Sequence, residues 1–271
     1  MKKVLITDLD DTLYPWIDVF VPSFYAMASA LSSYIKTDLS LLFDEYRAVH
    51  QYYGNVEHPY ATLALPSVSR FFGDMPKEEQ KNALSPVFDA YRAERQKRLH
   101  LFPRVKETLS RLHESGVTII GYTNSTVKNG YGRLKSLDIA HLFSRVYCAA
   151  NVADEAALPT AVRTVTSRKP DKDTLLFIIK EEGFSPDEAI CVGDSMTNDV
   201  YMAWQAGVTS VLLPHPPHDA ALYDLLVEIS SWTDATFALD RALKEEVKEK
   251  GVSPDYTFPL FSDLLPLFSI V

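Results

Sequence analysis

VLITDLDDTL, residues 4–13, joins a short apolar run to a cluster of acids. Residues 3–7 are too few for a helix and rich in apolar side chains, so they predict a buried strand. Asp8 falls at the carboxyl end of that strand, and Asp10 follows where the chain turns. Crowded carboxylates repel one another unless a cation is present, and Mg²⁺ prefers oxygen ligands. The stretch therefore indicates a metal site, although Asp-x-Asp also occurs in solvated loops.

Short apolar runs and helical patterns alternate along the rest of the chain. Further strands are predicted at residues 117–122, 189–192 and 208–213, with a weaker candidate at 144–148 and a short edge strand at 256–258. Helical patterns occupy residues 103–114, 127–137, 171–182, 198–205 and 262–268. This alternation predicts an α/β fold, a doubly wound parallel sheet with helices on both faces.

One interval is too long for a single crossover connection. The first strand ends near Asp8 and the next begins near Val117, whereas a crossover unit needs only ~30 residues in all. Apolar residues at helical spacing fill the interval. We therefore expect an inserted all-helical cap at residues 14–101 and a discontinuous α/β core at residues 1–13 and 102–271. A helical subdomain with no role in the site is the alternative.

Residues 215–252 look like a second, polar and helical insertion before the final strand. The insertion opens with His215 and His218 among three prolines. A metal site needs three or four ligands, and no acidic or thiol partner completes one locally. A rigid turn is therefore favoured over a metal site.

Two polar segments end predicted strands or follow them closely. Thr123 and Asn124 come after residues 117–122 and lead toward a helix, where a hydroxyl and backbone donors hold anions well. A plain helix N-cap is the alternative. Asp194 follows residues 189–192, and Asp199 comes five residues later. These acids again indicate a metal site at the end of a buried strand.

Lys169 precedes a proline that favours an extended backbone and a helix start. It is placed to point into the site, with an ordinary solvated lysine as the alternative. Parallel strands present their carboxyl ends at one edge of a sheet, so the four segments should converge there. Together they supply acids for a metal, donors for phosphate and one cation, which phosphoryl transfer requires.

Taken in order, the four motifs resemble those of the haloacid-dehalogenase-like hydrolases with a helical cap. The motifs are Asp-x-Asp-x-Thr at 8–12, Thr-Asn at 123–124, Lys-Pro at 169–170 and Gly-Asp-x₄-Asp at 193–199. The resemblance implies that Asp8 is the nucleophile and a metal ligand. It implies that Asp10 is the general acid/base and binds the metal through its backbone carbonyl.

The same resemblance implies roles for the remaining motif residues. Thr123 and the amide of Asn124 would hold the transferring phosphate, and Lys169 would neutralise it, with Lys172 as the fallback. Asp194 would bind the metal and Asp199 would support the site.

The activity implied is Mg²⁺-dependent hydrolysis of a small phosphorylated metabolite, a nucleotide or sugar phosphate, through an aspartyl-phosphate. A phosphomutase or a dehalogenase of the same fold is an alternative, although family dehalogenases lack the acid that Asp10 provides. A non-catalytic regulatory member is a third possibility. It predicts a lost catalytic aspartate, and none is lost.

Two segments are similar to pyrimidine 5′-nucleotidase-like members. They are Tyr14-Pro15 after the first motif and the tyrosine-glycine stretch at residues 52–58. The Thr-Leu-Arg-Gly-Leu continuation expected in that group is missing. Tyr53, Asn55 and His58 are candidates to contact the leaving group, with cap-surface packing as the alternative.

Charge and composition exclude several classes of protein. A formal net charge of −9 argues against a partner that is a nucleic-acid polymer. No apolar run approaches the ~20 residues of a membrane helix, and the N-terminus turns acidic too soon for a signal peptide. Two cysteines, Cys148 and Cys191, cannot form a disulfide framework. We expect a cytoplasmic monomer or homodimer without a membrane partner.

Overall fold

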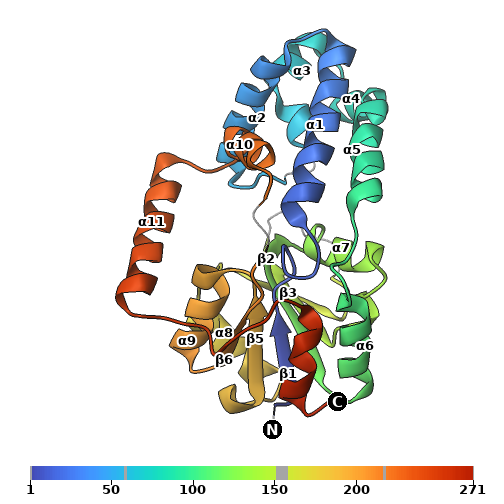
Figure 1. Ribbon diagram of the computed structural model, residues 1–271. Coiled ribbons are helices and arrows are strands. Elements are labelled where there is room, and N and C mark those ends of the chain that lie inside the picture. The colour runs from blue at the N-terminus through green and yellow to red at the C-terminus, as the bar shows by residue number, and fades with distance from the viewer. Residues whose placement is uncertain (1, 58–59, 151–157, 216–217, 271) are drawn as a thin grey trace. The chain divides into compact units, whose positions relative to one another are not determined.

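A seven-stranded parallel sheet forms the centre of the α/β part of the chain (Figure 1). The computed structural model describes residues 2–57, 60–150, 158–215 and 218–270. Within these residues the strand order is β4-β3-β2-β1-β5-β6-β7, which confirms the predicted fold class. The strands are β1 (Val4–Thr7), β2 (Thr118–Thr126), β3 (Arg145–Ala149), β4 (Val162–Val165), β5 (Ala189–Gly193), β6 (Thr209–Leu212) and β7 (Tyr256–Thr257).

Strand β1 is central because all four of its residues are apolar or small enough to be buried. It pairs in parallel with β2 on one side and β5 on the other. Val4 and Ile6 pack in the core formed with α8 (Lys172–Glu181) and α9 (Tyr201–Ala206). Side chains alternate along a strand, so Leu5 and Thr7 face the opposite side of the sheet.

Helices cover both faces of this sheet. Figure 1 shows α6 (Val105–Glu114) and the C-terminal helical turn η5 (Phe261–Phe268) on one side, and α8 and α9 on the other. The chain runs from β1 outward to β2, β3 and β4, then returns to β5 on the other side of β1. The order therefore reverses between β1 and β5, and open α/β sheets bind ligands beyond the carboxyl ends of strands at such a point.

Contacts divide the chain into two units. The α/β unit contains Met1–Pro15, His100–Pro216 and Ala242–Val271, and the helical unit contains Trp16–Leu99 and Pro217–Arg241. The described elements of Trp16–Leu99 are all helical. They are α1 (Trp16–Ile35), α2 (Leu39–Tyr53), η1 (Ala61–Ala64), α3 (Pro66–Phe72), α4 (Lys77–Ala83) and α5 (Ser85–Arg98).

Residues 217–241 differ from the predicted division, which assigned everything from residue 102 onward to the α/β core. This segment contains α10 (Ala220–Ile229) and the start of α11 (Asp234–Glu249). Leu226 and Ile229 are fully buried in the apolar core of the helical unit. The carbonyl oxygen of Ile229 also lies 2.6 Å from Nδ1 of the buried His50. The segment therefore packs as part of the helical unit.

Two strands differ from their sequence predictions. Strand β2 runs to Thr126, so Thr123 and Asn124 lie within it, and the next helix, α7 (Gly130–Ser136), begins later than expected. The extension pairs Thr126 with Ala149 of β3 after an irregularity in the register. Strand β4 was not predicted, because only Val162 of its four residues is buried and no apolar run marks it. None of the helices described here has the length and apolarity needed to cross a bilayer.

Candidate active site

Lys169 lies between two carboxylates at the carboxyl edge of the sheet. Its Nζ is 2.9 Å from Oδ1 of Asp8 and 2.8 Å from Oδ1 of Asp199. Asp8 directly follows β1, and its backbone N–H donates to the carbonyl oxygen of Val192 in β5. Strands β1 and β5 therefore fix its position. The Lys169 side chain is 2% exposed. A lysine this buried is retained only with charge partners, so the solvated-lysine alternative does not apply.

Asp194 completes an acidic cluster with Asp8 and Asp199. One carboxylate oxygen from each lies within 4.8 Å of the others. Thr12 donates a hydrogen bond to Oδ1 of Asp194 at 3.3 Å. The cluster therefore joins the loop after β1 to the loop after β5.

A π-helical turn, η4 (Met196–Val200), brings Asp199 back against the end of β5. Its carboxylate accepts the backbone N–H of Ser195 at 3.2 Å. A Cβ added to Gly193 would lie 2.1 Å from Oδ2 of Asp199, so this position must be glycine for the carboxylate to fit. Such π turns are frequent at functional sites.

The cluster holds more negative charge than Lys169 neutralises. Burial raises the pKa of Asp8 to about 7, with Lys169 opposing the rise and Asp199 adding to it. Burial raises the pKa of Asp194 to about 8, and the charges of Asp199 and Asp8 add to that shift. Burial alone would lower the pKa of Lys169, but Asp199 and Asp8 outweigh burial and raise it, so Lys169 stays charged.

The donor set fits a hard divalent cation. Asp8, Asp194 and Asp199 offer only carboxylate oxygens, which Mg²⁺ prefers. A cation beside them would also supply the missing positive charge, because a nearby cation favours the ionised form of a carboxyl group.

The Asp10 carboxylate bonds to side chains that are not part of this cluster. Its Oδ1 accepts from Nη1 of Arg133 at 2.8 Å, and its Oδ2 accepts from the hydroxyl of Ser125 at 2.7 Å. Neither Arg133 nor Ser125 is among the site residues predicted from the sequence. A signal was present for Arg133, because Gly130, Arg133 and Leu134 share the buried face of α7 at helical spacing. An arginine on an otherwise apolar face needs a charged partner.

Thr123 and Asn124 lie beside the site with specific partners. The Thr123 hydroxyl accepts from the Ser125 N–H at 3.0 Å and donates to Oδ2 of Asp10 at 3.4 Å. The Asn124 side chain accepts from the Lys169 N–H at 2.8 Å and thereby ties β2 to the segment that carries Lys169. The fallback residue, Lys172, is exposed in the first turn of α8.

Comparison with protein families decides the classification. Residues 5–213 match the family described as haloacid dehalogenase-like hydrolase. The chain belongs to this family. The matched range contains all four motifs, so the resemblance inferred from them is confirmed.

Several known proteins are similar to this family member. Phosphoglycolate phosphatases of Salmonella typhi and Escherichia coli (strain K12) are 34% identical over 155 residues, which is 57% of this chain and 55% of theirs. The chain thus spans about half the length of the curated relatives it matches.

Solved structures share the fold. The 2-haloacid dehalogenase of Pseudomonas syringae pv. Tomato DC3000 has a TM-score of 0.61 and 18% identity, with 99% of both chains covered. A phosphoglycolate phosphatase, described as predicted, from Haemophilus somnus 129PT has a TM-score of 0.53 and 21% identity, with 98% of both covered.

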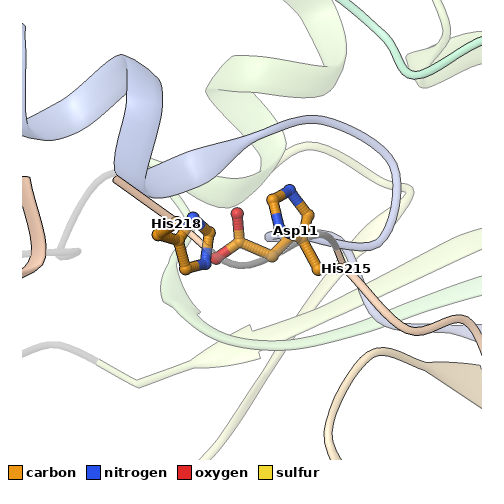
Figure 2. A group of neighbouring side chains, drawn as sticks. All are labelled: Asp11, His215 and His218. Atoms are coloured by element: carbon orange, nitrogen blue, oxygen red, sulfur yellow. The ribbon is translucent and has the colours of Figure 1, made fainter. Parts of the chain in front are cut away.

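Asp11 and His215 lie close together in the α/β unit. Figure 2 shows the Asp11 carboxylate beside the His215 ring, and one ligand atom of each lies within 4.8 Å of the other. The local sequence around His215 offered no acidic partner, and the structure supplies one from the loop after β1. His218, also drawn in Figure 2, groups with the helical unit by its contacts. Two ligands from one unit do not make a metal site, so none is assigned there.

The residues predicted to contact the leaving group lie in the helical unit. Tyr53 ends α2 and is 48% exposed. Oδ1 of Asn55 accepts the Glu57 N–H at 2.9 Å and so closes the turn after α2. His58 lies outside the described residues.

Proposed function

We propose that this family member is a Mg²⁺-dependent phosphomonoester hydrolase that works through an aspartyl-phosphate. The observation that carries the proposal is the placement of Lys169 between Asp8 and Asp199, with Asp194 in the same acidic cluster. Asp10 lies next to the cluster, and its carboxylate is bonded by Ser125 and Arg133. The site therefore offers a nucleophile, a separate acid/base and a cation, which phosphoryl transfer needs. The phosphatase relatives support the same activity.

Asp8 and Asp10 divide the chemistry between them. Asp8 attacks phosphorus in line and forms the aspartyl-phosphate. Asp10 gives a proton to the leaving alcohol and then takes one from the water that cleaves the intermediate. Lys169 lies 2.9 Å from Asp8, where it neutralises charge on the transferring phosphate. The Thr123 hydroxyl and the Asn124 backbone amide hold that phosphate.

Mg²⁺ is the cofactor in this proposal. Asp8, Asp194 and the backbone carbonyl of Asp10 would hold it, and Asp199 would support them by fixing Lys169. When bound, the ion neutralises phosphate charge and orients the ester.

The substrate in this proposal is a small phosphorylated metabolite. Phosphoglycolate is a candidate from the names of the relatives. Nucleotides and sugar phosphates are candidates from the motif resemblance. Cys148 and Cys191 are buried thiols, which agrees with a reducing cytoplasm. We propose a monomer or homodimer.

Phosphate release from an aryl phosphate tests the proposal. We expect turnover with Mg²⁺ and loss of turnover with EDTA. Ca²⁺ should inhibit, because its longer bonds and higher coordination number suit in-line transfer poorly. A panel of phosphoglycolate, pyrimidine 5′-nucleotides and sugar phosphates would then rank substrates by kcat/KM. Turnover undiminished by EDTA, or full turnover with Ca²⁺, would contradict the assigned metal role.

A further inference from the structure

Asp10 is held by side chains that are not members of the acidic cluster. Nη1 of Arg133 reaches both Oδ1 of Asp10 at 2.8 Å and the Ser125 hydroxyl at 3.3 Å. The Ser125 hydroxyl donates to Oδ2 of Asp10 at 2.7 Å. The two carboxylate oxygens are therefore fixed from two elements, α7 and the end of β2. A carboxylate with both oxygens bonded has little freedom to rotate.

Arg133 reaches Asp10 from a helix that packs unusually close to the sheet. A Cβ added to Gly130, the first residue of α7, would lie 3.1 Å from Cγ2 of Thr123 and 3.4 Å from Cβ of Ser125. Glycine thus allows the helix to approach β2. The guanidinium lies 5.8 Å from the centre of the buried Tyr14 ring, and the Arg133 side chain is 4% exposed. Arg133 is thus buried beside the Tyr14 ring and bonded to the Asp10 carboxylate.

Two cations divide the acids of this site into two groups. Lys169 bonds Asp8 and Asp199, which belong to the cluster that fits a divalent cation. Arg133 bonds Asp10. A divalent cation attracts every nearby carboxylate, and a carboxylate bound to it cannot transfer a proton to the ester. An acid/base two residues from the nucleophile therefore needs a separate anchor.

We propose that Arg133, assisted by Ser125, is a positioning residue. It keeps the Asp10 carboxylate from joining the acidic cluster and holds it in place for proton transfer. The inference rests on the proposed function, since it requires Asp10 to be the acid/base. Arg133 acts through Asp10 and needs no contact with the substrate. Its loss should therefore change the steps that use Asp10 and leave substrate binding intact.

The test compares leaving groups in single and double variants. An alkyl phosphate needs protonation of its leaving oxygen and an aryl phosphate needs little, so Asp10→Asn should lower kcat for the alkyl ester ~10²–10⁴-fold and the aryl ester less. Arg133→Met should show the same preference with a loss of ~10–10²-fold, typical of a misplaced catalytic group, and an unchanged KM. Combining both substitutions should cost no more than Asp10→Asn alone, because the two residues act as a unit.

Arg145→Met is the matched control. Arg145 is the first residue of β3 in the same unit, at the end of the strand opposite to the carboxyl edge, and it pairs with Glu182 at 3.2 Å. This variant should lower the free energy of unfolding without any leaving-group preference. Losses that multiply in the double variant, or equal losses for alkyl and aryl esters with Arg133→Met, would overturn the proposal.

If Arg133→Met does not fold, two milder variants test the same positioning role. Arg133→Lys keeps the charge on a shorter side chain without the planar guanidinium, and Ser125→Ala removes the 2.7 Å bond. Both variants should lower alkyl-ester turnover more than aryl-ester turnover. If each variant lowered turnover of the two esters equally, the proposal would be overturned. If Asp10→Asn itself shows no leaving-group preference, the acid/base assignment in the proposed function fails. If Asp10→Asn shows it and the Arg133 variants do not, the positioning role alone fails.

Discussion

Crowded carboxylates at Asp8 and Asp194 should link the proposed metal binding to pH. Burial raises their pKa values to about 7 and about 8 in the metal-free protein. Below those values the groups are protonated, and a metal ion must displace the protons to bind. Mg²⁺ affinity should therefore rise as pH increases through this range and level off above pH ~8.

Calorimetric titration with Mg²⁺ at a series of pH values measures this linkage. Below pH ~7 we expect a gain in affinity of at least ~10-fold per pH unit, because binding releases a proton from each raised group. Asp194→Asn should weaken binding and flatten the dependence. An affinity that stays constant across the range would show that these carboxylates do not bind the ion.

The acids of this site and Lys169 could be predicted from the sequence, whereas the partners of Asp10 could not. Asp8 and Asp194 follow strands whose apolar runs can be recognised in the sequence. Because these strands pair in parallel, the two acids meet at one edge of the sheet. Arg133 pairs with a residue 123 positions away. Only the close approach of α7 to β2 creates that pair, and the sequence shows a buried arginine without showing its partner.

At the scale of elements, the turn after β5 depends on one glycine. In Gly193→Ala the new Cβ would overlap the Asp199 carboxylate, which must then move away from Lys169. We expect a loss of ~1–3 kcal/mol in the free energy of unfolding from overpacking. A displaced Lys169 should also reduce kcat ~10²-fold.

Gly132→Ala is the matched control for this prediction. Gly132 lies in α7, has no atoms within 4 Å of an added Cβ, and has no positive φ. Alanine should stabilise this helix by ~0.5–1 kcal/mol and leave activity unchanged. Denaturant unfolding and phosphate release measured on both variants check the contrast. Wild-type activity in Gly193→Ala would contradict the assigned role of the Asp199 and Lys169 pair.

Elements with clear apolar runs were predictable, and those defined by pairing were not. The buried strands β1 and β5 and the amphipathic helix α6 appear at the predicted positions. Strand β4 forms because the edge of β3 offers backbone groups to pair with, and only Val162 enters the core. The extension of β2 through Thr123 depends on pairing with β3 in the same way. Both features require the neighbouring strand to be known.

At the scale of the whole molecule, α10 belongs to the helical unit although it is far from that unit in sequence. Ile229 is fully buried there, and its carbonyl oxygen contacts His50. Ile229→Ala should therefore reduce the stability of the helical unit by ~2–4 kcal/mol through a cavity in its core. Hydrogen exchange should become faster in α2 and stay unchanged in β1 and β5.

Leu239→Ala on α11 provides the control, because Leu239 is 73% exposed and its truncation creates no cavity. Exchange in this variant should match that of the parent protein. Faster exchange in β1 or β5 of Ile229→Ala, with α2 unchanged, would place α10 with the α/β unit instead.

The central claim is that Asp8 carries the phosphoryl group during turnover. Borohydride reduces an aspartyl-phosphate to homoserine, so quenching a reaction with it and mapping peptides by mass spectrometry identifies the modified residue. We predict homoserine at position 8 when substrate and Mg²⁺ are both present, and unmodified Asp8 when either is omitted. Steady turnover without modification at position 8, or modification at any other aspartate, would contradict the account.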